Sequence, residues 1–355
     1  MKYWIRKLRK FIYKLSPTVL KYCTCISVFL ALLGRLGIEK LKEIPVYGIG
    51  DWAVTVDSLI DIQINGAAYP VIRVCIYSAA CVFTLLSICK YLMHPKAVVL
   101  KHSAFSNALS GYDDTLLNGY TVQEFDVDLV KQMKDQNIET AISRQDRIIK
   151  KIKASCDEYT ELFYYGIAHI PLIFRAGFQI GDEGKTRLLH KYRNGTGQFK
   201  EISTENDEFI RCLDPQKKVY NNNSKEMLMV VATSFPVSNQ DLEAFHQNNI
   251  RCELRLEMRD KTMYGVDAIE SYGQMERLRS PIMSEMRDMV SQYSIERIHL
   301  VLSTSSDFTF YLAEGFSEHH DPEIIVYQYE RNSDVKYPWG ISNIAPPEDA
   351  VFCVS

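Results

Sequence analysis

Two long apolar runs dominate the first hundred residues. Residues 22–34 read YCTCISVFLALLG and residues 74–89 read VCIYSAACVFTLLSIC, and a cation flanks each end of both runs. A helix needs roughly 20 apolar residues to cross a bilayer, and flanking cations that reach the headgroups lengthen the usable run. The pattern therefore predicts transmembrane helices at about residues 17–38 and 71–93, joined by a loop at residues 39–70.

Two other structures could give such runs, buried helices of a globular domain and a cleaved signal peptide. Helices buried in a globular domain usually keep one polar face, whereas these runs are apolar on every face. A cleaved signal peptide has a short basic start and small residues at its cleavage site; here the leader is long and no such site follows. The transmembrane interpretation fits the pattern better than either alternative.

The segment before the first run, MKYWIRKLRKFIYKLS, alternates cations with aromatic rings. Rings of this kind lie at headgroup depth, and the cations meet lipid phosphates. Cations are concentrated before the first run and after the second, so the positive-inside rule places both termini in the cytoplasm. Residues 1–95 are thus predicted to form a membrane module whose loop lies outside the cytoplasm.

From residue 96 onward, short apolar strands alternate with amphipathic helices, which is typical of an α/β domain. Strands are expected at 96–105, 226–235, 251–258 and 323–330, and helices at 122–158 and 268–293. Three composite segments are also expected: a strand, a Gly/Pro break and a short helix at 162–178, a hairpin turning at Asn194-Gly195 in 186–202, and a strand that opens a helix at 296–316.

This strand and helix pattern occurs twice. Residues 215–224 (PQKKVYNNNS) are polar and rich in turn formers, and they mark the predicted boundary. We therefore expect two Rossmann-like halves, at residues 96–215 and 225–345. Ligands of such sheets bind outside the carboxyl ends of the strands.

Charge is unevenly distributed along the chain. Residues 1–100 hold 13 Lys and Arg against 5 Asp and Glu, whereas the remaining residues hold 28 against 39. This asymmetry indicates that the basic part meets an anionic surface. The acidic part lacks the broad positive surface of a non-specific nucleic-acid binder, so no polymeric nucleic acid is expected as a partner.

The chain carries few signs of catalysis or metal binding. Its nine cysteines form no C-x-x-C pair and no zinc-like spacing, which favours a reducing compartment. No P-loop, G-x-S-x-G or H-E-x-x-H motif is present. His319, His320 and Asp321 are adjacent, but histidines in a connection between Gly and Pro are more often solvated than ligating. We expect no enzymatic activity, no cofactor and no metal.

Several segments together match a known family pattern. They are RIHLVLS at 297–303, a helix end at Ala313 and Gly315, PEIIVYQYE at 322–330, the following Tyr337-Pro338, and the Gly/Pro-interrupted segment 162–178. In this respect residues 96–345 resemble the SAVED domain, the sensor of bacterial antiphage (CBASS) effectors. Many members have a Pro after the His-bearing strand, where this chain has Thr304-Ser305-Ser306-Asp307.

The resemblance implies two fused Rossmann-like (CARF-like) halves that bind a cyclic di- or trinucleotide made by a partner nucleotidyltransferase. Ligand binding in the family promotes oligomerisation. Two membrane segments before a SAVED domain are similar to one class of these effectors, whose implied output is disruption of the bacterial inner membrane and abortive infection. The implied partners are the cyclic oligonucleotide second messenger, the lipid bilayer and further copies of the chain.

Residues suited to such a ligand follow the predicted strands. Hydroxyl and backbone N–H groups at a helix N-terminus bind phosphate, aromatic rings stack on bases, and cations offset phosphate charge. The candidate ligand-binding residues are Lys101, His102, Phe105, Ser234, Phe235, Ser303, Ser305, Ser306, Tyr329 and Arg331. Simpler roles are also open: Ser306 as a helix cap, Phe235 as a core residue and Arg331 as a solvated side chain.

Two other classes of function remain as alternatives. A membrane-anchored hydrolase of nucleotides or acyl compounds would need a base beside Ser303 or Ser306, and the nearest histidine, His299, lies on the same predicted strand. A membrane scaffold would instead recruit a protein partner through the acidic domain.

Overall fold

A computed structural model describes residues 96–354, apart from 110, 113, 158–159, 182–185, 193–197, 205–212 and 248, together with helical Ser78, Val82 and Leu85. The chain divides into two compact units, Met1–His94 and Pro95–Ser355. The segments predicted to cross the membrane at 17–38 and 71–93, and the loop at 39–70, lie outside the described residues except for those three positions. Within the described part of the chain, no helix has both the length and the hydropathy of a membrane span.

The first half of the second unit is built on a five-stranded sheet in the order β2-β1-β3-β4-β5. Its strands are β1 (Lys96–Ser103), β2 (Thr121–Asp128), β3 (Thr160–Ile167), β4 (Thr186–Lys191) and β5 (Phe199–Glu201). The first four are parallel, and β5 returns antiparallel to β4. The helices are η1 (Asp114–Leu117), α6 (Val130–Lys134), α7 (Ile138–Ser155) and α8 (Ile170–Ile180).

The second half is built on a seven-stranded sheet in the order β12-β11-β10-β9-β7-β8-β6. Its parallel strands are β7 (Glu226–Ala232), β8 (Cys252–Met258), β9 (Arg297–Ser303) and β10 (Glu323–Gln328), and its antiparallel ones are β6 (Leu213–Val219), β11 (Trp339–Ser342) and β12 (Val351–Cys353). The helices are α9 (Glu243–His246), η2 (Lys261–Met263), α10 (Tyr272–Tyr293), α11 (Ser306–Glu314) and η3 (Pro347–Asp349).

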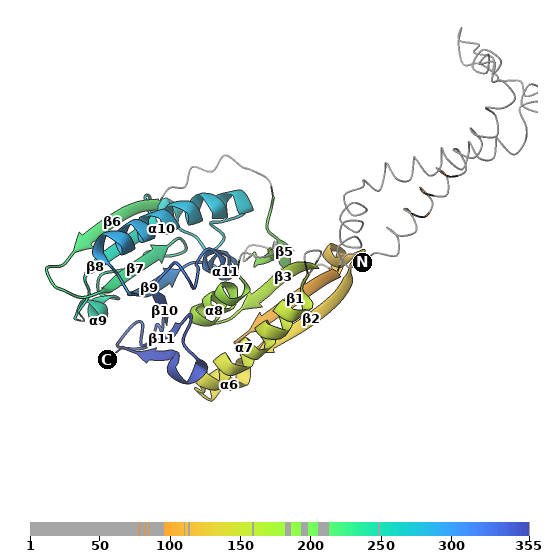
Figure 1. The fold of residues 1–355 in the computed structure, drawn as a ribbon, viewed down its shortest axis with the longest axis horizontal. Helices are drawn as coiled ribbons and strands as arrows, with labels where there is room; N and C mark the ends of the chain where they lie inside the picture. The colour runs from red at the N-terminus through yellow and green to blue at the C-terminus, as the bar shows by residue number, and fades with distance from the viewer. Residues whose placement is uncertain are drawn as a thin grey trace, which may run out of the picture. The chain divides into compact units, whose positions relative to one another are not determined.

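The parallel strands of both halves follow one plan. The order β2-β1-β3-β4 in the first sheet is repeated as β8-β7-β9-β10 in the second, and Figure 1 shows the two sheets with their helices. In each half a helix follows the third parallel strand, α8 after β3 and α11 after β9. The predicted α/β class is confirmed, and the repeated strand order is what two Rossmann-like halves require.

The two halves are joined where α8 packs against α11. A Cβ atom at Gly177 of α8 would lie 2.5 Å from the carbonyl oxygen of Phe310 in α11, so only glycine permits this approach. The ring of Phe310 stacks on Tyr164 of β3 at 4.0 Å. Arg175 of α8 donates hydrogen bonds to the carbonyl oxygens of Ser342 and Ala345. One cluster of buried side chains consequently runs through both halves.

Two predicted elements were wrong, and both are edge strands. Residues 121–128 form β2 rather than the start of a helix: TVQEFDVD pairs with β1 on one side only, and Val122 is 40% exposed. Residues 213–219 form β6 rather than part of a turn-rich boundary, so the second sheet begins before residue 225. Pro215 is tolerated there because an edge strand leaves one row of backbone groups unpaired.

The close approach of α8 and α11 gives a stability prediction. Gly177→Ala should lower the free energy of unfolding by about 1–3 kcal/mol, because the added methyl group overpacks the helix contact. Gly265→Ala is the matched control, since its Cβ would meet no atom closer than 3.8 Å, and it should change stability by less than about 0.5 kcal/mol. Urea denaturation of both variants measures the difference; equal stabilities would contradict the proposed packing.

Candidate functional site

An open pocket of about 410 Å³ lies where the two halves meet, next to the carboxyl ends of β3, β7 and β9. The first half contributes residues at the end of β3 and on β4 and β5. The second half contributes Ser234 and Phe235 after β7, Val266 and Asp267 before α10, and residues 302–307 between β9 and α11. The pocket thus occupies the edge at which ligands of Rossmann-like sheets bind.

Ser303 connects the two central strands of the second sheet. Its carbonyl oxygen accepts hydrogen bonds from the backbone N–H groups of Thr233 and Ser234 at 2.9 and 2.8 Å. Its hydroxyl accepts one from the N–H group of Phe235 at 3.2 Å. Ser303 therefore shapes the floor of the pocket, and it holds Phe235 at the rim, where the ring is 58% exposed.

The N-terminus of α11 is the part of the pocket best suited to an anion. Ser305 is the N-cap residue, rather than Ser306, and its side chain makes no capping hydrogen bond. The Ser305 hydroxyl oxygen is buried without a hydrogen-bond partner. Because the first N–H groups of a helix have no partners within the helix and lie at its positive end, this end favours a bound anion.

Beside this helix end, His190 of β4 lies between two carboxylates. Its Nδ1 atom is 3.1 Å from Asp307 Oδ2, and its Nε2 atom is 3.1 Å from Asp267 Oδ1. Burial opposes the charged form of the imidazole, but the two carboxylates outweigh it and raise the pKa of His190 to about 9. We call Asp267, His190 and Asp307 the His190 cluster; it joins β4 of the first half to the second half.

Lys191 and Phe199 form the first-half wall of the pocket. The Lys191 Nζ atom donates a hydrogen bond to the carbonyl oxygen of Ala108 at 3.0 Å and lies 5.6 Å from the centre of the Phe199 ring. Lys191 and His190 are thus the two cations in the pocket lining, and Asp267 and Asp307 are its two anions. The pocket therefore combines two cations, two anions and the positive end of a helix.

Half of the residues predicted for the ligand site line this pocket, namely Ser234, Phe235, Ser303, Ser305 and Ser306. Three others lie at or near the end of β1 and do not line it. Lys101 forms an ion pair with Glu124 at 2.7 Å. His102 is fully buried, and burial lowers its pKa to about 3. Phe105 stacks on His169 at 4.5 Å.

The remaining two predicted residues follow β10 and are also outside the pocket lining. The Tyr329 ring packs edge-on against Tyr337 at 5.4 Å. The carbonyl oxygen of Arg331 accepts a hydrogen bond from Lys336 at 3.1 Å within a turn. His299, considered above as a base for Ser303, is bonded instead to Tyr327 and Glu226.

The His190 cluster was missed in the sequence. Its members are separated by 77 and 117 positions along the chain, and no local motif connects them. His190 was visible only as one position of a hairpin strand. Asp307 directly follows the predicted hydroxyl loop, so of the three residues only Asp307 could have been identified from a local sequence pattern.

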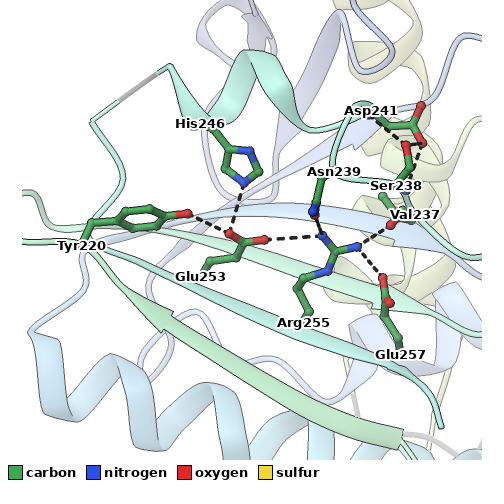
Figure 2. Close-up of polar contacts among 9 residues, drawn as sticks. All are labelled: Tyr220, Val237, Ser238, Asn239, Asp241, His246, Glu253, Arg255 and Glu257. Atoms are coloured by element: carbon green, nitrogen blue, oxygen red, sulfur yellow. Dashed lines mark hydrogen bonds and ion pairs between the residues drawn. The ribbon is translucent and has the colours of Figure 1, made fainter.

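A second groove, of about 690 Å³, lies over β6 and β8. Figure 2 shows its polar contacts: Glu253 accepts one hydrogen bond from Tyr220 and lies 3.1 Å from His246. Arg255 donates hydrogen bonds to Asn239, to the carbonyl oxygen of Val237 and to Glu257. These charged groups are hydrogen-bonded to one another or to neighbouring polar groups, so they have a structural role without any ligand. Among the described residues, no group of three His, Cys, Asp or Glu side chains is arranged to hold a metal.

Comparison with known proteins gives one family match. Residues 144–342 match the model of the SAVED family, described as the SMODS-associated and fused to various effectors sensor domain. No curated protein sequence matches the chain.

Solved structures similar to this chain include Cap4 SAVED/CARF-domain containing receptors. The Acinetobacter baumannii receptor with the cyclic trinucleotide 2′3′3′-cAAA is 12% identical with a TM-score of 0.49, and the match covers 81% of this chain and 63% of that one. The same receptor with 3′3′3′-cAAA is 13% identical with a TM-score of 0.49, and the match covers 81% of this chain and 64% of that one. The Moraxella osloensis receptor is 12% identical with a TM-score of 0.42, and the match covers 78% of this chain and 61% of that one. The chain thus spans less than two thirds of the length of these receptors.

The His190 cluster predicts how stability depends on pH. Since the folded pKa of about 9 exceeds the unfolded value of 6.5, the charged cluster stabilises the fold fully below pH 6.5, and this contribution is lost as pH rises through 9. The difference in free energy of unfolding between wild type and His190→Gln should fall by about 3 kcal/mol over that range. Urea denaturation at pH 6 and pH 10 measures it; a difference independent of pH would contradict the charged cluster.

Proposed function

This chain belongs to the SAVED family of sensor domains, and we propose that its pocket binds a cyclic oligonucleotide second messenger of an antiphage defence system. The observation that carries the proposal is the N-terminus of α11, which opens into a pocket shared by both halves and has an unpartnered Ser305 hydroxyl. A phosphate group of the ligand would accept hydrogen bonds from Ser306 and the first backbone N–H groups of the helix, and also from the buried Ser305 hydroxyl after rotation of its side chain.

The rim of the pocket suits the bases of such a ligand. Phe235 presents an exposed ring directly beside the serine loop, and aromatic rings stack on any base. Phe199 and Lys191 lie on the opposite, first-half wall. Since both halves line the pocket, a ligand bound there would contact both. We propose a cyclic di- or trinucleotide, made by a partner nucleotidyltransferase, as the class of ligand.

The proposed output is binding-driven rather than catalytic. In this proposal, ligand binding promotes self-association of the sensor, and residues 1–95 then disrupt the inner membrane. The two apolar runs and the basic, aromatic leader of that module support a membrane target. The resulting loss of membrane integrity would end the infected cell's growth before the phage matures.

Ligand binding is tested by the thermal stability of the purified chain with a panel of cyclic di- and trinucleotides that includes 2′3′3′-cAAA and 3′3′3′-cAAA. At least one compound should raise the melting temperature, because a ligand that binds only the folded state stabilises it. A panel with no stabilising compound would refute the sensing function.

The place of binding is tested with two matched phenylalanines. Phe235→Ala should weaken binding of the stabilising compound by about 1–3 kcal/mol, the usual loss of one stacked base. Phe105→Ala removes a similarly exposed ring that lies outside the pocket lining, and it should leave the affinity unchanged. Equal affinities of the two variants in calorimetric titration would place the ligand elsewhere.

The membrane output is tested in cells that produce the stabilising compound. Deletion of residues 1–95 should abolish toxicity and dye entry, because the deleted segment holds both apolar runs. Thermal stabilisation of the shortened protein by the compound serves as the control for an intact sensor. Toxicity that survives the deletion would show that the membrane module is not the effector.

A further inference from the structure

The acidic residue Asp307 raises a problem for any anion in the pocket. It is the second residue of α11 and is 3% exposed. A carboxylate in the first turn ordinarily lies against the positive end of its own helix, where it is stabilised by the N–H groups. There it would occupy the position of an incoming phosphate, and its charge would repel the ligand.

The structure shows what happens to this carboxylate instead. Asp307 Oδ2 is hydrogen-bonded to Nδ1 of His190, which belongs to β4 of the other half. The second ring nitrogen of His190 is 3.1 Å from Asp267, which also lines the pocket. A single imidazole therefore engages both carboxylates of the pocket and leaves the Ser305 hydroxyl at the helix end unpartnered.

We infer that His190 is a positioning residue for anion binding, which offsets one of the two negative charges of Asp307 and Asp267 and holds both carboxylates in hydrogen bonds, away from the N-terminus of α11. The inference rests on the proposed function, because it concerns how the same pocket accepts phosphate. His190 itself need not contact the ligand, since both of its ring nitrogens are already hydrogen-bonded. Its effect is to convert an acidic pocket into one that tolerates a polyanion.

Protonation of His190 is the condition for this role. The groups around it are Asp307 from α11, Asp267 from the segment before α10, Tyr192 just beyond β4, its neighbour Lys191, and Lys200, its backbone partner in β5; Glu270 acts on Tyr192. The nearest of these are the two carboxylates, and they favour the charged imidazole. Anion binding should therefore be constant from pH 7 to pH 8 and should weaken as pH rises through about 9.

A double-mutant cycle tests the inference by calorimetry with two probes, 3′3′3′-cAAA and inorganic pyrophosphate. His190→Gln should weaken binding of both probes by about tenfold or more, because the variant lacks the positive charge that offsets the carboxylates of Asp307 and Asp267. Asp307→Asn in the same chain should restore the affinity to within about threefold of wild type, since it removes the nearer charge. The rescued variant should also lose the decline in affinity above pH 9.

His246→Gln is the matched control. His246 is likewise hydrogen-bonded to a carboxylate, that of Glu253 at 3.1 Å, but it lies over the second groove (Figure 2) and does not line the pocket. It should leave both affinities unchanged. If His190→Gln fails to fold, the variant that combines His190→Gln with Asp307→Asn still tests the role of His190, because this double variant should fold and bind both probes.

The outcomes separate the inference from the proposed function. Undiminished binding by folded His190→Gln, or no rescue by Asp307→Asn, would overturn the role of His190 while leaving the ligand class intact. Histidine-dependent binding of pyrophosphate, without binding of any cyclic oligonucleotide, would support the role of His190 and refute the proposed ligand. Failure of wild type to bind either probe class would overturn both.

Discussion

The close contact between α8 and α11 is the constraint on which the rest of the structure depends. Each helix follows the third parallel strand of its own half, so each begins at the carboxyl edge of its sheet. Because Gly177 lets α8 approach the backbone of Phe310, the two halves share one core. The carboxyl ends of their strands are then brought together around one pocket, and neither half encloses that pocket alone.

The two halves share one strand order, but the N-termini of α8 and α11 differ in their hydrogen bonds. At the start of α8, the N–H group of Ile170 donates to Gln328, Pro171 has no N–H group, and the N–H groups of Leu172 and Ile173 donate to His169. That helix end is closed by the protein itself. At the start of α11, the N-cap side chain makes no capping bond, and Ser305 and Ser306 line the pocket. Only the N-terminus of α11 lies in the lining of the pocket, and it is the helix end to which the proposed function assigns the ligand.

Much of this could be predicted from the sequence where the signal was local. The strand and helix on either side of the Gly/Pro break at residues 162–178, and the strand that opens a helix at residues 296–316, follow from short patterns. The serine loop was found for the same reason. The edge strands β2 and β6 were missed because one side of each faces solvent, which leaves too weak an apolar pattern to distinguish strand from helix or turn.

The electrostatics of the pocket could not be predicted in this way. His190 comes from a hairpin strand in one half, and its two carboxylates come from the other half. Only the fold brings them together. Lys101 and His102 were both predicted to bind the ligand, but the fold separates them. Within β1 successive side chains alternate between faces, so Lys101 pairs with Glu124 of β2 and His102 is buried in the core.

The most direct test of the whole account is to locate the bound ligand on the chain. Backbone amide chemical shifts can be followed while a cyclic oligonucleotide that stabilises the protein is added. If the ligand binds at the N-terminus of α11, the largest changes will occur at Ser305, Ser306 and Asp307, with further changes at Phe235 and Lys191. Changes confined to the groove over β6 and β8, with the amides of α11 unaffected, would contradict binding at that helix end.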